Sequence, residues 1–150
     1  MWFDESVIYQ IYPLGLCGAP EENDGNTKPR VLRLLDWVDH IKAVGADTVL
    51  LNPAFDSDRH GYDTRDYFHT DPRLGTDSDL AQVCEAFHNA GLRVMLDGVF
   101  NHVGRGFWAF RDVREKKWDS PYKDWFHINF DGDTNYNDGF WYEGWEGHNE

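Results

Sequence analysis

Short apolar runs alternate with longer amphipathic segments in the first two thirds of the chain. Residues 7–12 (VIYQIY) combine β-branched and aromatic side chains and stop at Pro13, which predicts a first strand. Residues 48–51 (TVLL) and 94–96 (VML) are apolar without alternation, as is typical of strands that are covered on both faces in a parallel sheet. The pattern therefore predicts three strands, of which the last two are buried.

The two segments between these runs have apolar side chains at helical spacing. A glycine follows each segment, where helices commonly end, and Thr76 or Asp77 can cap the second helix. Alternation of strands and helices in this order is typical of right-handed βαβ units in a parallel sheet. The apolar faces consist of Leu34, Trp37, Val38 and Ile41 in residues 30–44, and of Leu80, Val83, Phe87 and Ala90 in residues 76–90.

The pattern changes after residue 102. The helical and strand periods disappear, glycine, asparagine and aspartate are interspersed with aromatic residues, and most of the seven tryptophans lie between residues 100 and 145. The carboxyl ends of strands are where α/β folds build their binding sites. We therefore expect a first unit over residues 1–103 and an irregular, aromatic-rich subdomain over residues 104–150 that is incomplete at its C-terminal end.

The length of the chain limits the fold. With 150 residues it can bury a core, but it is too short for a complete α/β barrel, which requires about 200–250 residues. Three parallel strands with a subdomain on the third make an open sheet whose edges are unpaired, which natural proteins avoid. We therefore expect the N-terminal portion of a longer or a split protein. The alternative is a small open α/β domain of three strands.

Charge and composition narrow the choice of partners. The formal net charge is −13 without any basic stripe, so neither a nucleic acid nor an anionic membrane is expected as a partner. No apolar run approaches the roughly 20 residues that span a bilayer, and residues 1–6 lack the basic start of a signal peptide. We therefore expect a cytoplasmic protein in which Cys17 and Cys84 are free thiols rather than a disulfide.

A polar segment after the second predicted strand, residues 56–67, places carboxylates and His60 beside Tyr62. Proteins hold a sugar with carboxylates, imidazoles and amides around its hydroxyl rim and an aromatic ring under its C–H face. His60 and Tyr62 are therefore candidate sugar-binding residues. The alternative is an acidic, solvated loop whose tyrosine fills the core.

A second polar segment, residues 97–102 (DGVFNH), stands at the end of the third predicted strand. In parallel α/β folds this end of the strands faces the active site, so Asp97, Asn101 and His102 can turn toward a ligand. The alternative is that Asp97 is a buried structural carboxylate and His102 a hydrogen-bonded loop residue.

Two loops are rich in the oxygen ligands that calcium prefers. Residues 131–138 resemble a calcium loop in composition, but the twelfth position counted from Asp131 is Tyr142, where an EF-hand has an acidic residue. A turn-rich hairpin is therefore favoured there, and no cysteine–histidine cluster suits zinc. The other loop could hold a cation through Asn23, Asp24 and Asn26.

Four motifs in order resemble the α-amylase family of glycoside hydrolases. VIYQIYP (residues 7–13) is similar to the first barrel strand of that family, and HGYDTRDY (60–67) with DPRLGT (71–76) is similar to its loop after the second strand. DGVFNH (97–102) matches the first conserved region, at the end of the third strand. SPYKDWF (120–126) resembles the subdomain that the neopullulanase, cyclomaltodextrinase and maltogenic amylase branch inserts there.

The resemblance implies an α/β fold that is a partial (β/α)8 TIM barrel, with the first three strands and an irregular subdomain inserted after strand 3. It implies a parent protein that is a retaining α-glycosidase acting on α-glucans such as maltodextrins or cyclodextrins. His60 and His102 would hydrogen-bond the sugar at the point of cleavage, and Tyr62 would stack under that sugar. Asp97 would orient an arginine beside the nucleophile, and Asn101 would ligate a structural calcium; no other cofactor is implied.

The sequence departs from the family in one respect. The nucleophilic aspartate, the acid glutamate and the third essential aspartate of the family lie on strands four, five and seven, and none of them can be matched to a residue of this chain. We therefore expect the chain alone to be inactive and to contribute substrate binding. The alternative is a non-catalytic carbohydrate-binding or structural fragment, such as half of a split barrel, and a homodimer of the parent protein is left open.

Tryptophans of the predicted subdomain are further candidates for stacking on sugar rings along one wall of the cleft. Because most tryptophans pack in cores, a core position is the favoured interpretation for each. The candidates are Trp125, Trp141 and Trp145.

Overall fold

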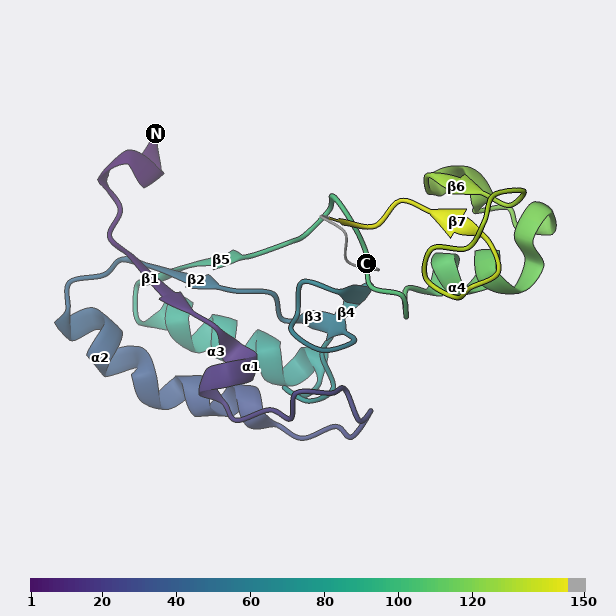
Figure 1. Ribbon diagram of the computed structural model, residues 1–150. Coiled ribbons are helices and arrows are strands. Elements are labelled where there is room, and N and C mark those ends of the chain that lie inside the picture. Colours follow the sequence, from purple (N-terminus) through teal and green to yellow (C-terminus); the bar gives the residue numbers. More distant parts are fainter. Residues whose placement is uncertain (146–150) are drawn as a thin grey trace.

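The computed structural model describes residues 1–145, and its centre is a parallel sheet of three strands in the order β1–β2–β5. Figure 1 shows these strands side by side, with helices α2 and α3 on one side of them. The register sets Tyr9 beside Val49 and Val49 beside Val94. The predicted α/β arrangement of strands and helices is thus present. The strands are β1 (Ile8–Ile11), β2 (Thr48–Leu51) and β5 (Arg93–Leu96).

The first connecting helix differs from the prediction in its winding. A 3₁₀ helix, η2 (Arg30–Trp37), leads directly into the α-helix α2 (Val38–Ala43). Val31 and Leu34 are both fully buried. Side chains three residues apart line up on a 3₁₀ helix, so this winding gives both residues access to the core.

The second connecting helix, α3 (Asp77–Asn89), begins and ends where the sequence predicts. The Thr76 hydroxyl accepts a hydrogen bond from the amide of Asp79, and the Asp79 carboxylate accepts one from the amide of Thr76. This reciprocal cap satisfies two amides that the helix itself leaves unpaired. Val83 and Phe87 lie one turn apart and are fully buried under the sheet.

The third strand is less buried than predicted. Leu96 is 46% exposed and Arg93 is also exposed. The prediction of a buried third strand is wrong for this chain because, within residues 1–145, β5 is an edge strand that pairs only with β2. Its outer edge therefore lacks the cover that a further strand would provide.

Residues 55–70 form a β-hairpin where the sequence suggested a loop. Strands β3 (Phe55–Ser57) and β4 (Thr64–Thr70) pair antiparallel, with irregular register on either side of Asp56. These strands are mostly polar, so they lack the alternating apolar pattern by which a half-buried strand is recognised. His60 and Tyr62 lie on the loop that joins them.

A buried ion pair between Asp71 and Arg73 anchors this hairpin. Both side chains are fully buried, and two guanidinium nitrogens of Arg73 donate to Asp71 at 2.9 and 2.7 Å. Arg73 also donates to the Ser57 hydroxyl and to the carbonyl oxygens of Pro20, Glu21 and Arg59. Burial disfavours the charged guanidinium, but its hydrogen bond and ion pair with Asp71 outweigh burial and raise the pKa of Arg73 above its ordinary value.

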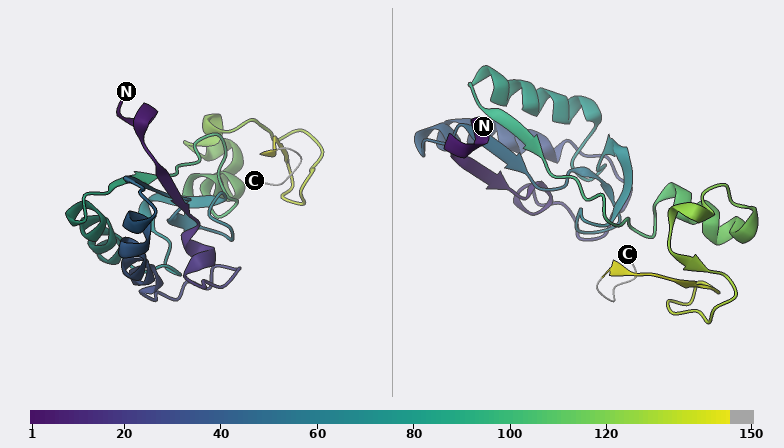
Figure 2. Two further views of the ribbon diagram at one scale, coloured as in Figure 1. Left: turned by 90° about the vertical axis from the view of Figure 1, so that its left-hand side faces the viewer. Right: turned by 90° about the horizontal axis from the view of Figure 1, so that it is seen from above.

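The chain after β5 forms a second hydrophobic cluster, and it is more regular than predicted. Figure 2 shows this part lying beyond one end of the sheet. Helix α4 (Trp108–Lys116) buries Ala109, Phe110 and Val113, so the prediction of an irregular segment is wrong there. Strands β6 (Ile128–Asn129) and β7 (Trp141–Tyr142) pair antiparallel, which confirms the predicted hairpin around residues 131–138.

Four short helical segments complete the described part, namely η1 (Trp2–Glu5), α1 (Pro13–Leu16), η3 (Lys117–Asp119) and η4 (Lys123–Trp125). Both cysteines are free, as predicted, and burial raises the pKa of the Cys17 thiol to about 11. Across residues 1–145 none of the helices has the length and apolar character needed to cross a bilayer.

We predict that Arg73→Met lowers the free energy of unfolding by about 3–5 kcal/mol, because it leaves the Asp71 carboxylate buried without its ion-pair partner. Equilibrium urea denaturation measures this change. Arg59→Met is the matched control: Arg59 pairs with Glu21 and Glu22 at the surface, where such pairs contribute less than about 1 kcal/mol. Equal losses in the two variants would contradict the anchoring role of Arg73.

Candidate functional site

Three polar side chains meet where the parallel strands end. The ladder continues past β2 and β5, because the Asn52 amide donates to the Ile11 carbonyl at 2.8 Å and the Asp97 amide to the Leu51 carbonyl at 2.9 Å. Asn52 and Asp97 are therefore held at the same level. The Asn52 carboxamide accepts from Gln10 at 2.9 Å and donates to the Asp97 carboxylate at 3.2 Å, so one side chain links all three strands.

Tyr62 is joined to this group through its hydroxyl, which accepts a hydrogen bond from Asn52 at 2.7 Å. Its side chain is 37% exposed, so the ring is not a plug in the core. Burial of the hydroxyl, together with the Asp97 charge nearby, raises the pKa of Tyr62 above its ordinary value, and the phenol stays neutral. The ring is thus fixed at its polar end while the remainder is open to a ligand.

His60 lies on the same loop and is oriented by local hydrogen bonds. The Tyr62 amide donates to the His60 Nδ1 at 3.2 Å, and the same nitrogen lies 3.5 Å from the Asp63 carboxylate. The Asp63 carboxylate accepts from the amides of His60 and Gly61 at 3.1 and 3.2 Å. Burial raises the pKa of Asp63, against the opposing effect of nearby His60.

His102 reaches the site from the segment that follows β5. A ring nitrogen of His102 lies 3.0 Å from the Tyr62 carbonyl oxygen, so it contacts the hairpin loop directly. The Gly104 amide donates to the Thr64 carbonyl at 2.9 Å and continues this contact. A side chain at Gly104 would overlap the Asp63 carbonyl oxygen, so only glycine allows so close an approach.

The structure brings together all four predicted sugar-binding residues: His60, Tyr62, Asp97 and His102. The alternative in which Tyr62 fills the core is wrong, whereas the structural role considered for Asp97 is compatible with its hydrogen bond to Asn52. Sugar binding by these residues stays a prediction.

Sequence reasoning missed Asn52, although a polar side chain directly after an apolar strand was a usable signal.

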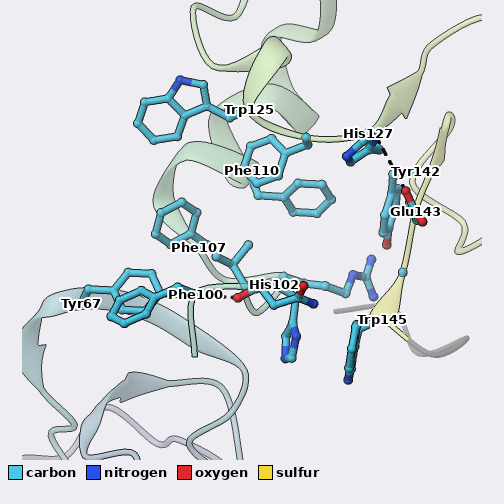
Figure 3. Close-up of a pocket in the computed structure, with 15 residues that line it drawn as sticks. Tyr67, Phe100, His102, Phe107, Phe110, Trp125, His127, Tyr142, Glu143 and Trp145 are labelled. Atoms are coloured by element: carbon cyan, nitrogen blue, oxygen red, sulfur yellow. Dashed lines mark hydrogen bonds and ion pairs between the residues drawn. The ribbon is translucent and has the colours of Figure 1, made fainter. Parts of the chain in front are cut away.

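A cavity of about 450 Å³ continues from His102 into the subdomain (Figure 3). It is lined mainly by aromatic side chains of the 100–107 segment, α4 and residues 142–145.

The Trp145 ring stacks on His102 with 5.3 Å between ring centroids and 18° between planes. Trp125 lines the cavity on the side away from Trp145, and Trp141 does not line it. All three tryptophans are exposed, so the core position favoured for them is wrong.

The oxygen-rich loops are engaged in contacts within the chain. The buried Asp138 carboxylate binds Arg105 and Arg114 at 2.6 and 2.8 Å and accepts from the Tyr142 hydroxyl. Within residues 1–145 no three histidine, cysteine or acidic side chains are grouped to hold a metal ion. The metal role of Asn101 stays a prediction.

The other loop considered for a cation is also closed by its own hydrogen bonds. The Asn23 carboxamide donates to Asp56 and to the Ser57 carbonyl, so it faces the hairpin. The Asp24 carboxylate accepts from the side chain and the backbone amide of Asn26, and these bonds lower the pKa of Asp24. Cation binding through these residues stays a prediction.

Comparison with known proteins places this geometry in a family. The family model of the alpha amylase catalytic domain matches residues 10–150. A cyclomaltodextrinase from a Bacillus species is 36% identical over 143 residues, covering 85% of this chain and 26% of that protein. Neopullulanase 2 of Thermoactinomyces vulgaris is 34% identical over 144 residues, covering 85% and 25%. The chain thus spans about a quarter of the length of these relatives.

Solved structures agree with the sequence relatives. A cyclic alpha-maltosyl-(1→6)-maltose hydrolase from Arthrobacter globiformis superposes with a TM-score of 0.78 at 32% identity, covering 98% of this chain and 37% of that one. A debranching enzyme from Nostoc punctiforme gives a TM-score of 0.78 at 30% identity, covering 98% and 36%. The family model spans nearly the whole chain, and the relatives are similar to it in sequence and in fold. The chain therefore belongs to the alpha-amylase family of glycoside hydrolases.

Proposed function

We propose that this chain forms the substrate-binding part of a retaining α-glycosidase that acts on α-glucans such as maltodextrins or cyclodextrins. Its strands β1, β2 and β5 are then the first three strands of a (β/α)8 barrel, residues 1–103 belong to that barrel, and residues 104–150 form a subdomain inserted after its third strand. The observation that carries the proposal is the hydrogen-bonded group around Asn52, which holds Tyr62 and Asp97 at one end of the sheet.

Each side chain of this group has a role that follows from its geometry. A glucose unit stacks its C–H face on the exposed ring of Tyr62, whose orientation is fixed by Asn52. His60 and His102, held beside Tyr62 by the hairpin loop and the 97–104 segment, hydrogen-bond sugar hydroxyls. Asp97 contributes a negative charge at the floor of the site, held by its hydrogen bond from Asn52.

The chemistry of retaining hydrolysis requires a nucleophile and an acid–base carboxyl group about 5–5.5 Å apart. Asp97 is bound by Asn52, and Asp63 is turned into its own loop by the amides of His60 and Gly61. Neither carboxylate is poised as such a partner, which supports a catalytic pair supplied from outside this chain, as the resemblance to the family implies. Two relatives from Bacillus subtilis are named intracellular maltogenic amylases, which supports a cytoplasmic location for the parent protein.

The isolated 150-residue chain is predicted to bind maltotetraose without cleaving it, because the proposal takes the catalytic carboxylates from outside it. Calorimetric titration measures binding, and release of reducing ends measures hydrolysis. Turnover above the uncatalysed rate would show that residues of this chain suffice for catalysis. Absence of both binding and turnover would favour the structural-fragment alternative.

We predict that Tyr62→Ala weakens the binding of maltotetraose by about 1–3 kcal/mol, because it removes the stacking surface. Tyr62→Phe keeps the ring and is expected to retain most of the affinity. Phe68→Ala is the matched control, since Phe68 is an exposed aromatic residue on the same hairpin but outside the site. Unchanged affinity in Tyr62→Ala, with unchanged folding, would assign the ring a structural role only.

Asn52→Leu is predicted to weaken glucan binding by about 1–3 kcal/mol, because Gln10, Tyr62 and Asp97 then lose their common partner. The hydrogen bond from Asn52 lowers the pKa of Tyr62, so its loss is expected to raise that pKa further. Ultraviolet titration of the phenol, compared with a variant that also carries Tyr62→Phe, measures the shift. An unshifted phenol titration would mean that Asn52 does not position Tyr62.

A further inference from the structure

A second hollow lies on the subdomain, away from the strand ends. Its volume is about 320 Å³, within the range of ligand pockets. Trp118 in η3 and Trp125 in η4 line it, and residues 125–127 separate it from the larger cavity beside His102, because both hollows share that segment. It is therefore distinct from the group around Asn52.

The two tryptophans of this hollow are unusually open to solvent, since each is 59% exposed. Aromatic neighbours nevertheless fix their rings. Trp118 packs against Phe130 with 4.8 Å between centroids, and Trp125 makes edge-to-face contacts with Trp108 and Tyr122 at 5.7 and 5.1 Å. Large aromatic surfaces that are exposed and already ordered bind a ligand at low entropic cost.

The polar side chains of the hollow indicate what kind of ligand it suits. Lys123, Asp124 and His127 line it, and the carboxylate of Asp124 and the ring of His127 are largely exposed. One cation and one anion, together with an imidazole ring, give the hollow both donors and acceptors. An anionic ligand would find no excess of positive charge here, and the chain as a whole carries −13. A neutral polyhydroxylated molecule fits this mixture of donors and acceptors.

We propose that the hollow between Trp118 and Trp125 is a second saccharide-binding site, which holds a short α-glucan segment by stacking and by hydrogen bonds with Lys123, Asp124 and His127. The identity of the sugar rests on the proposed function; the hollow itself does not. The hollow adjoins the larger cavity beside His102, so a glucan held there keeps its free end at a raised local concentration near that cavity.

The test is calorimetric and fluorescence titration of the full 150-residue chain with maltotetraose. The wild type is compared with Trp118→Ala. Trp118 is chosen because Trp125 also lines the larger cavity. We expect two sites in the wild type, and about tenfold weaker binding at one of them in Trp118→Ala, as for the loss of an aromatic contact. Trp141→Ala is the matched control, since Trp141 is an exposed tryptophan of the same subdomain and lines neither hollow.

A second variant, Lys123→Met, keeps the stem of the side chain and removes its charge, and it is expected to weaken the same site. Tyr62→Ala is expected to affect only the other site. A single site that responds to Tyr62→Ala and not to Trp118→Ala would overturn this inference and leave the proposed function intact. No glucan binding at all in the wild type would overturn both.

Sedimentation velocity separates a sugar site from a contact between proteins. We expect Trp118→Ala and the wild type to sediment alike over a range of protein concentrations. A change in association state in Trp118→Ala, with unchanged maltotetraose binding, would identify the hollow as a protein interface and would overturn the proposal.

Discussion

The geometry of the site depends on one buried ion pair, between Asp71 and Arg73. Its guanidinium joins three stretches of chain that are distant in sequence: residues 20–21, the hairpin at residues 57–59, and its own segment. A buried ion pair is stable only when further hydrogen bonds satisfy the remaining donors, and the carbonyl oxygens around Arg73 do this. The polar hairpin that presents His60 and Tyr62 can therefore be ordered without a hydrophobic stripe of its own.

The strand ends meet this hairpin through hydrogen bonds rather than through apolar packing. The parallel ladder sets the level of Asn52 and Asp97, while Arg73 sets the position of the loop that carries Tyr62. Asn52 joins the ends of the strands to the hairpin loop, because its carboxamide bonds to Gln10 and Asp97 at the strand ends and to Tyr62 on the loop. A carboxamide is suited to this place since it donates and accepts at once, and it adds no charge beside Asp97.

The sequence could predict those parts of the fold that follow an apolar period. The strand at residues 48–51 and helix α3 with its Thr76 cap were predicted closely, because burial of an unbroken apolar run or of helically spaced side chains leaves a direct trace. The β3–β4 hairpin was not predictable in this way, since a buried charge at Arg73 stabilises it. Helix α4 was missed because its nine residues are too few to show a period among many aromatics. The four site residues could be named from motifs, but the link that Asn52 makes between Gln10, Tyr62 and Asp97 needed the register of the sheet.

The segment that leads from β5 to the subdomain is bound to the β3–β4 hairpin. This contact sets where the aromatic side chains of the subdomain lie. Gly104 lies against the Asp63 carbonyl, and the Gly106 amide donates to Asp58 at 2.9 Å, so the segment is bound to the hairpin on leaving the strand. The Tyr67 hydroxyl also donates to the Val99 carbonyl. The subdomain therefore departs in a direction fixed by the same hairpin that carries Tyr62. The large cavity consequently opens beside His102, and Trp125 lies between that cavity and the second hollow.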